Sequence, residues 1–79
     1  MIKKYYRVEI QISDKVWDKY HRTPEYTRMV LEACKGSTEN GSESYGPIFE
    51  WALYDTLEAA QECEKGLMDV LYHFSAKFL

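Results

Sequence analysis

The chain has 79 residues, of which 46% are hydrophobic and 29% are charged, and its formal net charge is −3. This length allows a single domain, residues 1–79, and the composition excludes a chain that is disordered throughout. Because no apolar run reaches the roughly 20 residues that span a bilayer, and the amino terminus lacks the apolar core of a signal peptide, we expect a soluble, cytoplasmic domain.

Residues 2–12 alternate between apolar and polar side chains. One face of this segment carries Ile2, Tyr6, Val8, Ile10 and Ile12, and the other carries Lys3, Tyr5, Arg7, Glu9 and Gln11. Because successive side chains of a strand point to opposite faces, the pattern predicts a half-buried strand.

The next segment contains one ambiguous stretch and one clear helix. Residues 16–20 fit either a short helical turn, capped by Ser13 or Asp14, or a strand that pairs with the first one. Thr23-Pro24-Glu25 is a typical helix start, because threonine caps the first turn and proline suits its first position. We predict a helix over about residues 24–35, ended by Gly36.

Residues 36–46 are rich in glycine, serine and asparagine. The glycines lack the spacing of a phosphate-binding loop, and glutamates stand among them. We predict a mobile, exposed connector. A short hairpin is the alternative, because Asn40-Gly41 is a favourable turn, although the flanking residues are poor strand formers.

Residues 48–54 alternate again and predict a second strand. Phe49, Trp51 and Leu53 lie on one face, which we assign to the core; Ile48, Glu50, Ala52 and Tyr54 lie on the other, which we assign to the outside. Even this outer face is largely apolar.

The last segment has the strongest helical pattern. Asp55-Thr56-Leu57-Glu58 resembles a capping box with Asp55 at the cap. An apolar stripe with helical spacing then comprises Ala60, Cys63, Leu67, Val70, Leu71, Phe74 and Phe78. Gly66 interrupts the helix and can admit a close neighbour. We expect Cys34 and Cys63 to be buried, reduced thiols, with a disulfide as the alternative.

The order strand, one or two helices, strand and long helix predicts a small two-layer α+β domain, which resembles half of a ferredoxin-like fold. A helical crossover between the two predicted strands would make them parallel. Two strands do not form a stable sheet alone. Either residues 16–20 or the 36–46 loop supplies a third strand, or two chains join their sheets in a homodimer.

The sequence contains no pattern of a catalytic, cofactor or metal site. Two cysteines are too few to bind zinc, and no serine lies in a nucleophile motif. We therefore predict a non-enzymatic domain, regulatory or inhibitory, that acts by protein contact. The candidate interface residues are Tyr5, Ile48, Ala52 and Tyr54 of the outer strand face, and Met68 and Tyr72 of the last helix.

The charge is divided unevenly along the chain. Residues 1–35 have a net charge of +3 and residues 36–79 a net charge of −6. The carboxylates that could contact a basic partner protein are Glu39, Glu43, Glu58, Glu62 and Asp69. A small acidic protein can present carboxylates where its partner expects phosphates, and this size and charge resemble those of phage-encoded inhibitors.

Nucleic-acid binding is the alternative function. Lys3, Tyr5 and Arg7 lie on one strand face, where bases could stack on the ring while the cations contact phosphates. The isoelectric point of about 5.3 counts against this alternative.

Overall fold

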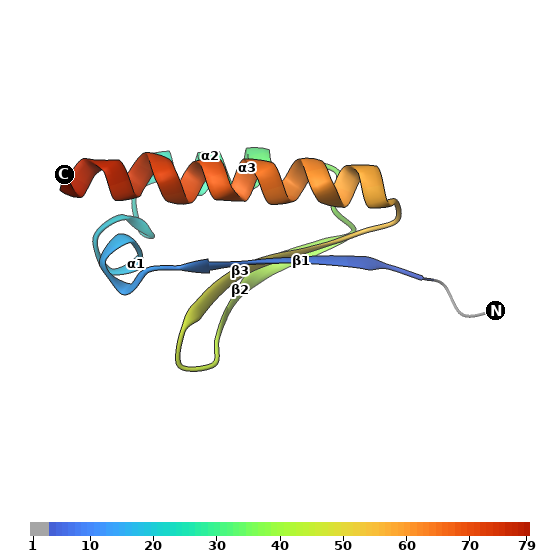
Figure 1. Cartoon of the computed structure of the whole chain (residues 1–79), viewed down its shortest axis with the longest axis horizontal. Helices are drawn as coiled ribbons and strands as arrows, with labels where there is room; N and C mark the ends of the chain where they lie inside the picture. The colour runs from blue at the N-terminus through green and yellow to red at the C-terminus, as the bar shows by residue number, and fades with distance from the viewer. Residues whose placement is uncertain (1–3) are drawn as a thin grey trace.

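The structure, a computed structural model, describes residues 4–79. Ile2 and Lys3, which belong to the first predicted strand, lie outside the described residues. In chain order the elements are β1 (Tyr6–Ile12), α1 (Asp14–Tyr20), α2 (Pro24–Ala33), β2 (Glu39–Ser44), β3 (Ile48–Tyr54), α3 (Leu57–Ser75) and a 3-10 turn (Ala76–Phe78). Figure 1 shows the sheet in one layer, with α2 and α3 side by side in the other. The predicted two-layer α+β class is confirmed.

The strands form an antiparallel sheet in the order β1-β3-β2. This is the order of a ferredoxin-like unit without its last strand. The predicted parallel arrangement of residues 2–12 and 48–54 is wrong, because β2 comes between them in the chain and the hairpin reverses its direction. The crossover through α1 and α2 instead joins β1 to β2, which run parallel to each other on either side of β3.

The connector predicted for residues 36–46 is also wrong, because residues 39–44 form β2 and pair with β3, as in the alternative hairpin. The hairpin turn lies further along than Asn40-Gly41. Tyr45 N donates to Pro47 O over 2.9 Å, and Gly46 adopts a φ of +94°. In β2 itself, Gly41 lies against the indole of Trp51, where a Cβ would be 3.2 Å from the ring. Pairing with β3 therefore forms a strand from residues of low strand propensity.

Local capping explains where the three helices begin. Residues 16–20 are helical, and Ser13 Oγ accepts from Val16 N over 3.4 Å. Thr23 Oγ1 accepts from Tyr26 N over 3.3 Å, which confirms the predicted start of α2. The cap of α3 is Thr56, not Asp55, because Thr56 Oγ1 accepts from Ala59 N over 3.2 Å.

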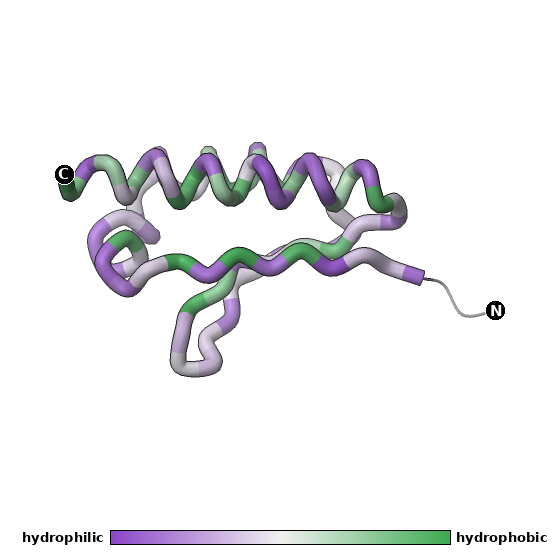
Figure 2. The backbone as a smooth tube through the Cα atoms, viewed as in Figure 1, coloured by the Kyte–Doolittle hydropathy of each residue, from purple (hydrophilic) through white to green (hydrophobic). Residues whose placement is uncertain are grey.

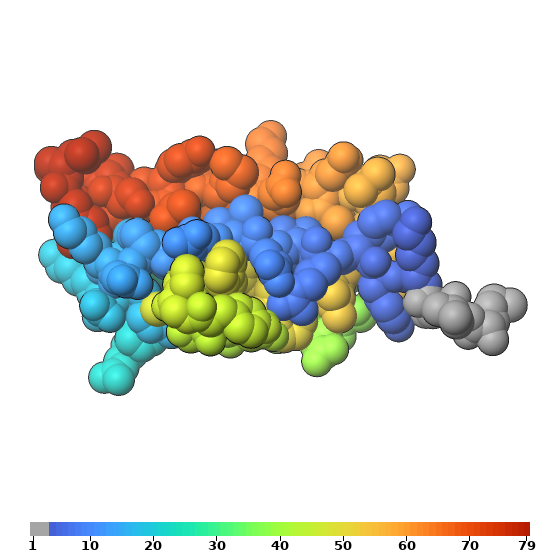
Figure 3. Space-filling view, turned by 60° about the horizontal axis from the view of Figure 1, so that its bottom comes forward, coloured from blue at the N-terminus to red at the C-terminus, as the bar shows by residue number. Residues whose placement is uncertain are grey.

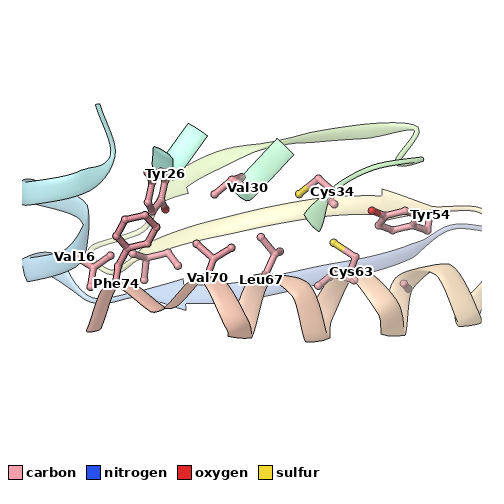
Figure 4. Packing of buried hydrophobic residues seen from close by; sticks show 13 residues of the cluster. Val16, Tyr26, Val30, Cys34, Tyr54, Cys63, Leu67, Val70 and Phe74 are labelled. Carbon is pink, nitrogen blue, oxygen red and sulfur yellow. The ribbon is translucent and has the colours of Figure 1, made fainter. Parts of the chain in front are cut away.

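The core lies between the helices and one face of the sheet. Along β1, hydrophobic and hydrophilic residues alternate as predicted (Figure 2), and Val8 and Ile12 are buried against α3. The predicted stripe of α3 supplies Ala60, Cys63, Leu67, Val70 and Phe74 to this core (Figure 4). Gly66 admits the close neighbour predicted for it: a Cβ there would lie 3.0 Å from Ala33 Cβ of α2.

Candidate functional site

The two faces of β3 are the reverse of the prediction. Ala52 is 0% exposed and Tyr54 is 3% exposed, so neither belongs to an outer surface. The register pairs Ala52 with Val8 and Tyr54 with Tyr6, whose side chains face α3. Ile48 shares this inward face. Of the predicted strand interface, only Tyr5 is well exposed, at 46%.

The outward face of β3 carries Phe49, Trp51 and Leu53 along the middle of the sheet. All three are half-buried, and they lie opposite the layer of α2 and α3. In Figure 3 the edge strand β1 and the hairpin come forward on this side of the molecule. We call this surface the open face; it is defined by Phe49, Trp51 and Leu53 and the flanking side chains of β1 and β2.

Arg7 covers the middle of the open face. Its guanidinium carbon lies 4.6 Å from the centre of the Trp51 ring. Arg7 Nε donates to Glu9 Oε1 over 2.6 Å, and an Arg7 Nη donates to Glu43 Oε2 over 3.2 Å. The hydrogen bond to Glu9 and the nearby Glu43 raise the pKa of Arg7. The side chain therefore crosses β3 and lies over the indole, a cation–π arrangement held from both neighbouring strands.

The open face is acidic at its edges. Register places Glu9 beside Trp51, Glu39 beside Leu53 and Glu43 beside Phe49. Arg7 is the cation that this register places among them, and two of the carboxylates already bind it. The predicted nucleic-acid patch is therefore largely neutralised at Arg7, while Lys3 lies outside the described residues.

The structure does not gather the predicted acidic surface in one place. Glu39 and Glu43 lie on β2, whereas the other three members, Glu58, Glu62 and Asp69, belong to α3. Glu62 and Asp69 line a groove between α2 and α3 together with the cations Arg28 and Lys35.

The predicted Met68–Tyr72 pair is exposed on α3, at 37% and 60% respectively. Because α3 lies in the helical layer, this pair and the open face are separate surfaces. A partner that covers one of them does not need to contact the other.

Glu50 is a polar core residue that we predicted, from the sequence, to lie on the outer face of its strand. It is 3% exposed and faces the helices, where the Ser42 hydroxyl donates to its carboxylate. Burial raises the pKa of Glu50, while Ser42, the nearby Tyr26 hydroxyl and His21 oppose that rise. A small pocket beside it is lined by Trp17 and Asn40 among others. The signal that could have identified Glu50 from the sequence is an acidic residue within an otherwise apolar strand.

Within residues 4–79, no three histidine, cysteine or acidic side chains are grouped as a metal would require. His73 contacts α2, where its Nε2 lies 2.8 Å from Glu25 Oε1. No helix in this part of the chain is long and apolar enough to cross a membrane.

No family model matches the chain, and no curated protein or solved structure resembles it significantly. Among the surfaces of the described residues, the open face is the candidate site.

Proposed function

We propose that the chain is a non-enzymatic protein-interaction domain that binds its partner through the open face. The observation that carries this proposal is the stripe of Phe49, Trp51 and Leu53 on the central strand, opposite the helical layer. Apolar and aromatic side chains surrounded by polar ones are typical of the centre and the rim of a protein interface.

The charges of the open face favour a basic partner. Three carboxylates, Glu9, Glu39 and Glu43, surround the stripe, and Arg7 is the cation among them. Two copies packed face to face would bring acidic rims together, which costs free energy. A different protein with an apolar centre and a basic rim fits better. Such binding would let this domain block a basic surface, and hence act as a regulator or inhibitor.

The proposal is tested by exchanging two apolar side chains of the open face. We expect Phe49→Thr with Leu53→Thr to weaken partner binding at least about tenfold, because apolar side chains at the centre of an interface carry much of the binding free energy. The partner is first captured from a cell extract on immobilised chain and identified by mass spectrometry. Its affinity for both chains is then measured with purified protein.

The matched control is Met68→Gln with Tyr72→Gln, which changes two exposed apolar residues on the helical layer. We expect this variant to bind as the unchanged chain does. If the control loses the partner while the open-face variant keeps it, the interface lies on α3 and the proposal is wrong.

Charge reversal tests the chemistry of the partner. Glu39→Lys is expected to weaken binding of a basic partner, whereas Glu58→Lys with Glu62→Lys, on the other layer, is expected to leave it unchanged. Light scattering that gives twice 9.4 kDa for the unchanged chain and 9.4 kDa for the open-face variant would identify the partner as a second copy. Captured material that is nuclease-sensitive and released between about 50 and 200 mM salt would favour the nucleic-acid alternative.

A further inference from the structure

The two cysteines of the chain meet in the core, although they belong to different helices. Cys34 is the residue that ends α2, and Cys63 lies in the first half of α3. Figure 4 shows both cysteine side chains in the space between the end of α2 and α3, with the Tyr54 hydroxyl beside them. Both thiols are free and buried, at 4% and 1% exposure.

A close helix contact brings the thiols together. One residue before Cys34 in α2, Ala33 lies against Gly66 of α3, where a Cβ would be only 3.0 Å from Ala33 Cβ. Cys63 precedes Gly66 by about one helical turn and so lies next to this contact. Tyr54 holds the end of α2 in place, because its hydroxyl donates to Lys35 O over 3.1 Å. A disulfide needs this kind of short backbone separation.

We propose that Cys34 and Cys63 form a redox-active pair, which small-molecule disulfides of the glutathione class convert to an intramolecular disulfide in the folded protein. The groove between α2 and α3 gives the reagent its approach, since Cys63 is among its lining residues. This inference does not depend on the proposed interaction, because the groove and the open face belong to opposite layers.

The environment of the pair supports Cys63 as the attacking group. The neighbouring Cys34 thiol lowers the pKa of Cys63, and the Tyr54 hydroxyl adds to this effect, although burial opposes it. The same contact with Cys63, together with burial, raises the pKa of Cys34. The thiolate is the nucleophile in disulfide exchange, so the reaction starts at the thiol that ionises first.

The exchange proceeds in two steps. The Cys63 thiolate attacks one sulfur of oxidised glutathione, whose disulfide breaks; one glutathione leaves as a thiolate and takes a proton from water. Cys34 then loses its proton to solvent and attacks Cys63 Sγ, which forms the Cys34–Cys63 bond and releases the second glutathione. Two protein thiols are oxidised, and one molecule of oxidised glutathione is reduced to two of glutathione.

The test uses the full folded chain in glutathione buffers from fully reduced to fully oxidised, without denaturant. Exchange is then quenched with acid, and only after the quench is the chain unfolded in guanidinium chloride with excess N-ethylmaleimide, which labels every free thiol. The intact mass reports how many labels each molecule carries. We expect the molecules to change from two labels to none as a single transition. The oxidised chain should melt at least about 5 °C higher, because the bond restricts the unfolded chain.

The single-cysteine variants define the pathway. Cys34→Ser keeps Cys63 and is expected to stop at one glutathione adduct, whereas Cys63→Ser is expected to form the adduct at least about tenfold more slowly. Two labels retained in fully oxidised buffer, a disulfide that joins two chains, or oxidation only after adding urea would each overturn the proposal. The measurement on the unchanged chain decides it even if a variant fails to fold.

Discussion

The two faces of the sheet differ in what covers them more than in how apolar they are. The covered face of β3 contains a small residue, Ala52, and even a carboxyl group, Glu50, yet both are almost fully buried. The open face contains the larger side chains of Phe49, Trp51 and Leu53, which remain half-buried. The packing of the helices therefore determines which face of β3 is buried. The side chains of the strand show only that either face is apolar enough to be covered.

The polar groups on the two faces also have different kinds of partner. On the covered face, Glu50 relies on the Ser42 hydroxyl, and its burial raises its pKa. On the open face, Arg7 pairs with Glu43 of another strand and lies over the indole of Trp51. The open face is thus an apolar surface that one exposed, ion-paired side chain partly covers, and a partner can displace that side chain at small cost in free energy.

The largest expected effect comes from comparing the replacement of a phenylalanine by alanine in the covered core and on the open face. Phe74, which is 0% exposed, packs its ring 4.8 Å from that of Tyr20 and 5.3 Å from that of Tyr26. We expect Phe74→Ala to cost about 3–5 kcal/mol of unfolding free energy, enough to unfold much of so small a domain. Phe49→Ala on the open face should cost about 1 kcal/mol. Urea unfolding measures both, and equal costs would show that the open face is covered in solution.

A smaller effect tests how closely the helices of the covering layer pack. Gly66→Ala adds a Cβ 3.0 Å from Ala33 Cβ and 3.2 Å from its Cα. Overpacking costs about 1–3 kcal/mol, and the better helix propensity of alanine returns about 1 kcal/mol, so we expect a net loss of about 1 kcal/mol.

The Ala33→Gly background is the control for this substitution. There Gly66→Ala should become less costly or even stabilising, because the crowded Cβ is gone. A Gly66→Ala change that stabilises the unchanged chain would show that α2 and α3 can separate more easily than their contact indicates.

Glu50 gives the covered face a pH dependence. Because its pKa is raised on folding, the folded chain holds this proton where the unfolded chain has released it. The contribution of Glu50 to stability is therefore most favourable at low pH and declines as pH rises from the unfolded pKa, about 4.3, through the raised folded value. Glu50→Gln should remove this decline and be more stable than the unchanged chain at pH 7. The measurement is the unfolding free energy of both chains as a function of pH. If the two curves run parallel, this prediction is wrong.

The smallest effect concerns Arg7 on the open face. Arg7→Gln removes two exposed ion pairs and a cation–π contact, so we expect a loss of only a few tenths of a kcal/mol. The Trp51 ring should become more accessible, which iodide quenching of its fluorescence measures in a Trp17→Phe background. Quenching that does not change would show that the indole is covered by something other than Arg7.

Local patterns in the sequence determined β1, α2 and α3. Their signals are the alternation of residues 2–12, the Thr23 cap and the apolar stripe from Ala60 to Phe78, and each acts within a few residues along the chain. The close approach at Gly66 was also readable, since a glycine inside a strong helix needs a reason.

Tertiary structure alone decided the candidate site. Alternation with a period of two separates the faces of β3 but does not say which one a helix will cover, because both are apolar. β2 exists only because its backbone pairs with β3, and that pairing also reversed the expected strand direction. Likewise, Cys34 and Cys63 meet only when α2 packs on α3. Contacts between residues far apart in the chain form once the whole domain has folded, so no local pattern could encode them.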